Sequence, residues 1–275
     1  MEVIINSNCE GGLVKALSTH AYGNGTQTIV LSHGYGSDQN VWHHIIPALA
    51  LYFKVLVCDL VLSSSVNPML YDPIRYSNFS AYAQDLTCIL DELHLKDTVF
   101  VGHSMSAMIG CLAATKRPDL FRHLVLLSGS PRYLNDTGYE GGFDRLELES
   151  LFNGIKYNFS GWVEDFVPQA IAVEDRGAIA EFEGSLGRMR PEIALSAART
   201  VFHSDNRDVL PQVHVGTTII QSEQDNVVPE SVAFYMKERI GAAAHLRILK
   251  TRGHFPQLTV PSYFLSVLKD ALGIN

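Results

Sequence analysis

The chain has 275 residues, of which 47% are hydrophobic, so it is long enough and apolar enough to bury a substantial core. Its formal net charge is −8, from 21 basic and 29 acidic residues, and no long basic run interrupts this balance. The charge argues against a nucleic-acid surface and against binding to an anionic membrane. No stretch of 18 apolar residues predicts a membrane span, and the N-terminal segment lacks the pattern of a secretion signal.

Four cysteines, Cys9, Cys58, Cys88 and Cys111, lie far apart in the chain, and three of them fall within apolar strand or helix patterns. No C-x-x-C pair, which is typical of zinc sites and redox motifs, is present. We therefore expect buried free thiols rather than disulfides or a zinc site. Free thiols indicate a reducing compartment, so we expect a soluble protein that is cytoplasmic and nuclear.

Short apolar runs alternate with helical patterns along the chain. Apolar residues between Phe79 and Leu93 recur at spacings of three and four, which predicts an amphipathic helix. This alternation predicts an α/β fold with a mostly parallel sheet and helices on both faces. The predicted strands are Thr28–Leu31, Lys54–Cys58, Val99–Val101, Leu124–Leu127, Thr217–Ser222 and Leu246–Leu249.

The alternation stops near residue 133 and resumes near 215, and the segment between is helical in pattern. Pro191 stands where a further helix can begin. We predict a core made of residues 1–133 and 204–275, with a helical insertion at 134–203. The insertion carries more aromatic side chains than a small bundle can bury, so we expect several of them to line a cavity against the sheet.

The segment Val99–Gly110 reads Val-Phe-Val-Gly-His-Ser-Met-Ser-Ala-Met-Ile-Gly and is similar to the nucleophile elbow G-x-S-x-G, with Ser106 in place of the last glycine. An elbow places a serine on a tight turn between a buried strand and a helix, which exposes its hydroxyl above the sheet. Ser106 is small enough for strand and helix to pass closely. The pattern is weak by itself, because many strand-helix corners carry Gly and Ser. Ser104 is the predicted nucleophile.

A nucleophilic serine needs a histidine base and a carboxylate, which follow this elbow in the order Asp, His. His254 follows the last predicted strand on a Gly-containing loop, at the carboxyl edge of the sheet. Asp225 lies just past the strand before it. Asp205 and Asp208 are alternatives, but they precede that strand. We therefore predict the triad Ser104, His254 and Asp225.

An oxyanion hole requires two backbone N–H groups directed at the carbonyl oxygen under attack. One should be the amide of Met105, directly after the nucleophile. The other should be the amide of Tyr35 in Leu31–Ser37, a strand followed by His-Gly-Tyr-Gly. This motif alone could be an ordinary glycine-rich turn. Together with the elbow serine, the carboxylate and the histidine, which occur in the expected order along the chain, it favours a serine hydrolase.

Other chemistries find little support in the sequence. Phosphate-loop, zinc-protease and dinucleotide-binding motifs are missing. His43 and His44 suggest a metal pair, but adjacent residues on a helix point apart, so we interpret them as part of a surface helix. We expect no metal and no cofactor.

These motifs together resemble the plant strigolactone and karrikin receptor family of α/β-hydrolases, and more distantly the bacterial RsbQ type. The resemblance covers roughly residues 25 to 272. The segments that carry it are His33–Gln39, Arg75–Asn78, Val101–Gly110, Arg117–Phe121, Ser130–Asn135, Gly141–Phe143, Met189–Leu195 and Gly253–Gln257.

The resemblance implies an α/β-hydrolase fold with a four-helix lid over an apolar pocket, and slow hydrolysis of a small apolar lactone of the butenolide type. In that family, ligand binding and lid rearrangement recruit an F-box protein of a ubiquitin ligase and a repressor protein. Carried over by position, the resemblance assigns the same triad and oxyanion hole. It also implies ligand-binding roles for His103, Phe143, Leu151, Trp162, Phe166, Phe182, Phe202 and Val227.

Three departures from the family pattern lie beside the predicted site. Tyr35 replaces a phenylalanine and adds a hydroxyl at the pocket mouth, and Met105 replaces a valine and should shape the pocket floor. Leu60–Asn67 replaces a glycine-rich loop and must follow a stiffer path. With these features the chain looks most similar to the "like-two" paralogue branch. An ordinary small-molecule carboxylesterase, or a non-catalytic interaction protein that retains the triad, are the alternative interpretations.

Overall fold

The computed structural model describes Cys9 and residues 11–274, and a seven-stranded sheet forms the centre of this part of the chain. The strand order is β1-β3-β2-β4-β5-β6-β7, and every neighbouring pair is parallel except β1 with β3. The predicted mostly parallel sheet is confirmed, with an added antiparallel edge strand. The strands are β1 (His20–Tyr22), β2 (Thr28–Ser32), β3 (Lys54–Cys58), β4 (Thr98–His103), β5 (Phe121–Leu127), β6 (Thr217–Gln224) and β7 (Ala244–Arg252).

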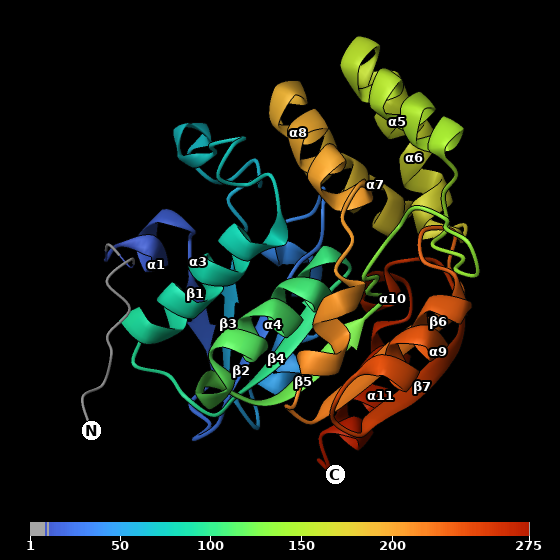
Figure 1. The fold of residues 1–275 in the computed structure, drawn as a ribbon. Helices are drawn as coiled ribbons and strands as arrows, with labels where there is room; N and C mark the ends of the chain where they lie inside the picture. Colours follow the sequence, from blue (N-terminus) through green and yellow to red (C-terminus); the bar gives the residue numbers. More distant parts are fainter. Residues whose placement is uncertain (1–8, 10, 275) are drawn as a thin grey trace.

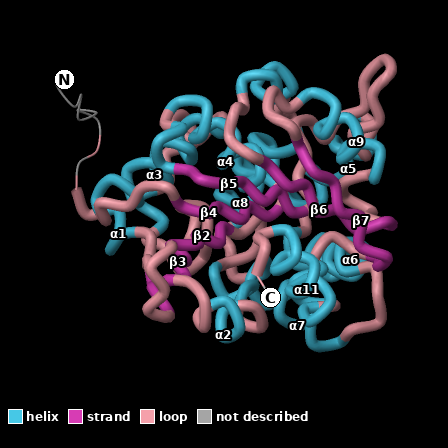
Figure 2. Tube along the Cα trace, turned by 90° about the horizontal axis from the view of Figure 1, so that it is seen from below, coloured by secondary structure: helices cyan, strands magenta, loops and turns pink. Residues whose placement is uncertain are grey.

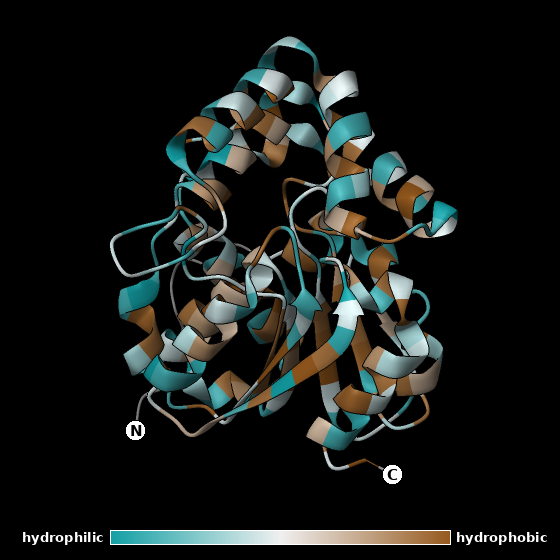
Figure 3. Ribbon diagram, turned by 90° about the vertical axis from the view of Figure 1, so that its right-hand side faces the viewer, coloured by the Kyte–Doolittle hydropathy of each residue, from teal (hydrophilic) through white to brown (hydrophobic). Residues whose placement is uncertain are grey.

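Helices cover both faces of the sheet (Figure 2). Helices α3, α4 and α9 lie on one face, and α2 and α11 lie on the other. Because both faces are covered, β2 and β4 are buried along their whole length, and each contains three consecutive apolar residues. Figure 3 shows hydrophobic residues along the strands of the sheet. The bounds are α1 (Leu13–Ala16), α2 (Ile46–Leu49), α3 (Phe79–Glu92), α4 (Met105–Lys116), α9 (Glu230–Arg239), α10 (Pro256–Thr259) and α11 (Pro261–Ala271), with 3-10 helices η1 (Gln39–Trp42), η2 (Pro68–Leu70), η3 (Pro118–Leu120) and η4 (Arg207–Gln212).

Four further helices lie between β5 and β6, within the interval where the sequence predicts an insertion. They stand together above the sheet in the view of Figure 1. Contacts join α5 to α6 and α8, and α6 to α7. We call these four helices the lid helices: α5 (Arg145–Tyr157), α6 (Phe159–Ile171), α7 (Arg176–Gly187) and α8 (Pro191–Phe202). Among the described residues, no helix has both the length and the apolar character needed to span a bilayer.

The expectation that every cysteine is a free thiol is wrong. Cys9 and Cys88 form a disulfide across 79 residues, whereas Cys58 and Cys111 are buried free thiols. Burial raises the pKa of each free thiol to about 12, so both stay protonated and unreactive. Sequence spacing could not reveal the disulfide, because its two cysteines are 79 residues apart and share no local pattern. The inference of a reducing compartment therefore loses its support from the cysteines.

Removing the disulfide should lower the free energy of unfolding. A bond that closes a loop of 79 residues restricts the unfolded chain, so Cys88→Ser should lose roughly 2–4 kcal/mol in denaturant unfolding without reductant. Adding a reductant should destabilise the unmodified protein and leave Cys88→Ser unchanged. An equal response of both proteins to reductant would contradict the disulfide, as would four titratable thiols in the unreduced, denatured chain.

Candidate active site

The backbone of Ser104 makes the sharp turn between β4 and α4. It adopts φ 57° and ψ −122°, a conformation that side-chain-bearing residues rarely take. Two backbone hydrogen bonds hold it, from Ser104 N–H to the carbonyl of Leu127 at 2.8 Å and from Ala107 N–H to the carbonyl of Ser104 at 3.0 Å. This strained strand-to-helix corner is the geometry of a nucleophile elbow.

Close packing around the corner explains its small residues. A Cβ atom on Gly102 would overlap the backbone carbonyl of Ser106, and a Cβ on Gly34 would lie 2.9 Å from the Cβ of Ser104. The hydroxyl of Ser106 donates to the carbonyl of His33 and lies 2.9 Å from the Oγ of Ser32. Ser106 therefore does more than keep the corner narrow, because it hydrogen-bonds the first turn of α4 to the loop after β2.

The three residues of the predicted triad are brought together. Nε2 of His254 lies 2.9 Å from Oγ of Ser104, and Nδ1 of His254 lies 2.8 Å from Oδ2 of Asp225. All three residues are buried. With the proton on Nδ1, the imidazole donates to the carboxylate and its Nε2 can accept the serine proton.

Backbone and side-chain donors fix the orientation of Asp225. Oδ1 accepts hydrogen bonds from the amides of Val227 and Val228, at 2.8 and 3.1 Å. Oδ2 also accepts from Nε2 of Gln221, at 3.2 Å. The carboxylate is thus held in place for His254 by the turn after β6 and by one buried glutamine, which the sequence did not single out.

The loop that carries His254 rests on a lid helix. The amide of His254 donates to the carbonyl of Ala170 in α6 at 2.8 Å, and the amide of Gly253 donates to Gln224 at 2.8 Å. Gly253 has φ 91°, and a Cβ atom there would overlap the carbonyl of Ile171. Only glycine lets the loop approach α6 this closely, so the position of the base depends on the end of that helix.

The two predicted oxyanion donors flank the nucleophile. Met105 is the first residue of α4, so its N–H has no partner within the helix and can bind a ligand oxygen. Tyr35 follows Gly34, which lies against Ser104. The side chain of Met105 is fully buried but does not line the cavity, so the expectation that it shapes the pocket floor is wrong. The backbone N–H of Met105 is therefore the group that the oxyanion prediction concerns.

His33 fixes the loop that carries Tyr35. The amide of Leu60 donates to Nε2 of His33 at 2.8 Å, which leaves the proton on Nδ1, and Nδ1 lies 2.8 Å from the carbonyl of Gly34. Burial lowers the pKa of His33, so the ring stays neutral. Leu60 begins the segment Leu60–Asn67, whose side chains are partly buried in the core. This segment therefore supports the oxyanion loop instead of lining the cavity.

A small cavity lies over the triad. Its volume is about 20 Å³, which is room for about one water molecule. Aromatic and aliphatic side chains from the core and from the lid helices fill most of the space around it. The lining residues are Tyr35, His103, Ser104, Tyr133, Phe166, Ala170, Phe182, Val201, Phe202, Val227, His254 and Phe255.

Some of the residues expected in the pocket lie behind it. Phe143 packs edge-on against Phe202 with ring centroids 5.2 Å apart, and Trp162 stacks on Phe166 at 4.9 Å. Leu151 is buried on α5 and is also absent from the lining. Phe143 and Trp162 thus pack against side chains that line the cavity without lining it themselves. The expected residues that do line the cavity are His103, Phe166, Phe182, Phe202 and Val227.

Tyr133 was not assigned a role from the sequence, yet its hydroxyl lies 3.3 Å from Oγ of Ser104. Burial raises the pKa of this phenol, so it stays neutral and can offer a proton near the nucleophile. Tyr133 follows β5 at the carboxyl edge of the sheet, which is the signal that could have identified it. His103 is also buried and has a lowered pKa, and its Nε2 lies 2.8 Å from the carbonyl of His254.

A buried Ser-His-Asp relay beside two N–H groups and an apolar cavity is the machinery of a serine hydrolase. The family model described as the alpha/beta hydrolase fold matches residues 27–261. The chain therefore belongs to the alpha/beta hydrolase fold family, and within it to the group of strigolactone and karrikin receptors that the following relatives define.

The chain is 42% identical to a strigolactone esterase of Arabidopsis thaliana, covering 94% of this chain and 97% of the relative. It is also 42% identical to a karrikin insensitive 2 receptor of Petunia hybrida, covering 94% of this chain and 96% of the relative. Among solved structures, a hydrolase from Oleispira antarctica is 31% identical with a TM-score of 0.92, covering 96% of this chain and 97% of the other.

Replacing the nucleophile should abolish turnover without unfolding the protein. Ser104→Ala should lower kcat for an aryl ester by roughly four to six orders of magnitude, because the members of a triad act as a unit. Ser106→Ala makes the same chemical change two residues away. It should lower the melting temperature more than Ser104→Ala does, through the lost hydrogen bond to His33, while keeping most of the activity. Activity of Ser104→Ala near that of the unmodified protein would rule out the assigned nucleophile.

The hydroxyl of Tyr35 should help to hold lid helix α8 over the site. It donates to the carbonyl of Ala194 at 3.0 Å, and a buried hydrogen bond of this kind contributes about 0.5–1.5 kcal/mol. Tyr35→Phe should therefore raise the hydrogen-exchange rates of α8 amides roughly two- to tenfold through local opening. A suitable comparison is Tyr71→Phe, which removes a hydrogen bond to Ser196 on the same helix outside the cavity. Unchanged exchange in α8 of Tyr35→Phe would contradict this role.

Proposed function

We propose that this protein binds a small apolar lactone of the butenolide type under the lid helices, hydrolyses it slowly, and signals through the resulting lid state. The observation that carries the proposal is the complete relay Asp225-His254-Ser104, with contacts of 2.8 and 2.9 Å, facing a cavity walled by apolar side chains. The similarity to a strigolactone esterase and to a karrikin insensitive 2 receptor supports the lactone class.

The chemistry follows from the positions of the groups. Oγ of Ser104 attacks the lactone carbonyl carbon while Nε2 of His254 accepts the hydroxyl proton. The amides of Tyr35 and Met105 would hydrogen-bond the oxyanion that forms. When the ring C–O bond breaks, His254 returns the proton to the departing oxygen. A water then attacks the acyl-enzyme with His254 again as base, which releases the hydroxy acid and restores Ser104.

The narrow cavity makes ligand entry depend on the lid helices. A butenolide ring with substituents is far larger than the space of about 20 Å³ over the triad. The aromatic side chains of Phe166, Phe182 and Phe202 would have to separate to admit it. Residues 134–203 would thus act as a movable lid, and closing it again over a bound or covalently attached product gives a basis for slow turnover.

The signalling part of the proposal concerns partners. We propose that a ligand-dependent arrangement of the lid helices recruits an F-box protein of a ubiquitin ligase and a repressor protein, in the cytoplasm and nucleus. The motivation is the membership of the receptor group, and the Cys9–Cys88 disulfide is the observation that weighs against a reducing compartment. Pull-down from a plant extract with and without a strigolactone analogue tests this part independently of hydrolysis.

The test of the enzymatic part is incubation of the protein with a butenolide lactone and with a simple aryl ester, in the unmodified form and as Ser104→Ala. We expect slow release of the hydroxy acid from the lactone, a mass increase on the unmodified protein, and a ligand-dependent melting shift. Both products and adduct should be lost in Ser104→Ala. No hydrolysis, adduct or melting shift with any lactone would remove the proposal.

Two other outcomes identify the alternatives. Fast, repeated turnover of the aryl ester without ligand-dependent partner binding would indicate an ordinary carboxylesterase, which the intact triad also permits. Loss of hydrolysis in Ser104→Ala with partner binding retained would indicate a non-catalytic interaction protein.

A further inference from the structure

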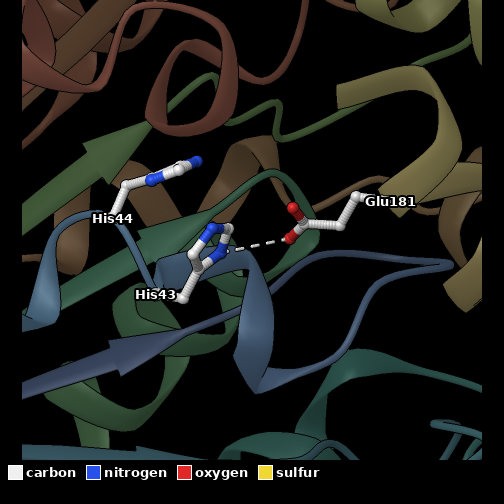
Figure 4. A group of neighbouring side chains, drawn as sticks. All are labelled: His43, His44 and Glu181. Carbon is white, nitrogen blue, oxygen red and sulfur yellow. Dashed lines mark ion pairs between the residues drawn. The ribbon is translucent and has the colours of Figure 1, made fainter. Parts of the chain in front are cut away.

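His43, His44 and Glu181 come together on the surface where the core meets the lid helices (Figure 4). His43 and His44 directly follow the 3-10 helix η1, and Glu181 lies on lid helix α7. One possible ligand atom from each residue lies within 4.8 Å of the other two. Two segments that are far apart in the sequence thus contribute to one cluster.

The sequence-based interpretation of the two histidines as divergent residues of a surface helix is wrong. Their ring centroids are 3.7 Å apart. The reason is local, because His43 and His44 lie in a turn between η1 and α2 rather than in a regular helix. A turn lets adjacent side chains leave the backbone on the same side, which a helix does not.

We propose that His43, His44 and Glu181 form a binding site for a divalent transition-metal ion, of which Zn²⁺ is the type, and that the bound ion joins lid helix α7 to the core. Two imidazoles and one carboxylate are a common protein ligand set for zinc. The same set disfavours Mg²⁺ and Ca²⁺, which prefer all-oxygen sites.

The contacts around the cluster show which histidine nitrogen faces the carboxylate. Nδ1 of His43 lies 2.8 Å from the carbonyl of Asn40 and 3.4 Å from Oε1 of Glu181. An ion bound by Nδ1 would replace the contact with Asn40, and an ion bound by Nε2 would require the exposed ring to turn. Within the described part of the chain, Oε1 of Glu181 is shielded from solvent without a hydrogen-bond donor, and its near neighbour is Nδ1 of His43 at 3.4 Å.

The site has room for water ligands and for small adjustments. A cavity of about 310 Å³ adjoins it and is lined by His43 and Glu181 together with Asp38, Asn40 and Arg188. A tetrahedral ion about 2.0–2.2 Å from each ligand brings ligand atoms to roughly 3.3–3.5 Å of one another. Both histidines are exposed, so rotation of their side chains can close the remaining gap.

A bound ion would act on the lid through α7. Glu181 is followed by Phe182, which lines the cavity over the triad and packs on Phe255 with ring centroids 4.3 Å apart. The hydroxyl of Ser185 already links α7 to the carbonyl of Gly36 at 2.8 Å. A metal link one turn earlier on the same helix would hold Phe182 in place and hinder its movement out of the cavity.

The test is calorimetric titration of the metal-free protein with ZnCl₂, followed by hydrogen exchange with and without the ion. We expect one Zn²⁺ per chain, no comparable heat with MgCl₂ or CaCl₂, and slower exchange of α7 amides in the loaded protein. Each of the variants His44→Gln and Glu181→Gln should bind Zn²⁺ at least roughly tenfold more weakly.

The matched control is His245→Gln, which removes an exposed histidine on β7 and should leave Zn²⁺ affinity unchanged. Melting curves of all variants in chelator establish that each remains folded. The proposal is overturned if the unmodified protein takes up no Zn²⁺. It is equally overturned if His44→Gln and Glu181→Gln bind as tightly as the control, since the uptake would then belong to other histidines.

Discussion

The crossing of three segments at Ser104 is the constraint on which the rest of the site depends. The end of β4, the loop after β2 and the first turn of α4 approach so closely that Gly34 and Gly102 have no space for a side chain. The hydroxyl of Ser106 joins two of these segments directly. A strained backbone costs about 1–3 kcal/mol and persists only where its surroundings over-determine it. Here the surroundings do so, and Oγ of Ser104 is directed at Nε2 of His254. The residues predicted to form the oxyanion hole, Tyr35 and Met105, adjoin the same corner.

The lid helices are bound to the same machinery that they cover. A carbonyl of helix α6 accepts a hydrogen bond from the amide of His254, and a carbonyl of helix α8 accepts one from the hydroxyl of Tyr35. A serine hydroxyl of helix α7 donates a hydrogen bond to the carbonyl of Gly36. Three lid helices therefore touch the base loop or the oxyanion loop. A displacement of the lid helices would change the catalytic geometry, and a ligand held in that geometry would in turn restrain them. This is the physical form that coupling between hydrolysis and signalling can take in this chain.

Much of the site could be predicted because its parts are local. The Gly-His-Ser-Met-Ser elbow, the turn after β6 and the Gly-His loop each follow a recognisable strand, and the carboxyl ends of parallel strands meet at one edge. What sequence could not show depends on distant packing. Tyr133 and Gln221 acquire their roles only through contacts with residues that are brought close by folding. The lining of the cavity depends on which aromatic side chains of the lid helices face inward. The Cys9–Cys88 disulfide joins two segments that share no sequence pattern. The close approach of the His43 and His44 rings was missed because a turn was taken for a helix.

The small volume of the cavity has a consequence for any measurement of affinity. If a ligand binds only the fraction of molecules whose lid helices are apart, its apparent dissociation constant exceeds the intrinsic one by the inverse of that fraction. That factor belongs to the protein and is common to all ligands that need the opening. Two compounds would keep their order of affinity although the apparent affinity of each would be low. A substitution that loosens the lid helices would lower both apparent dissociation constants by the same ratio. Selectivity and sensitivity are thus separable properties here: the lining side chains set the first, and the lid contacts set the second.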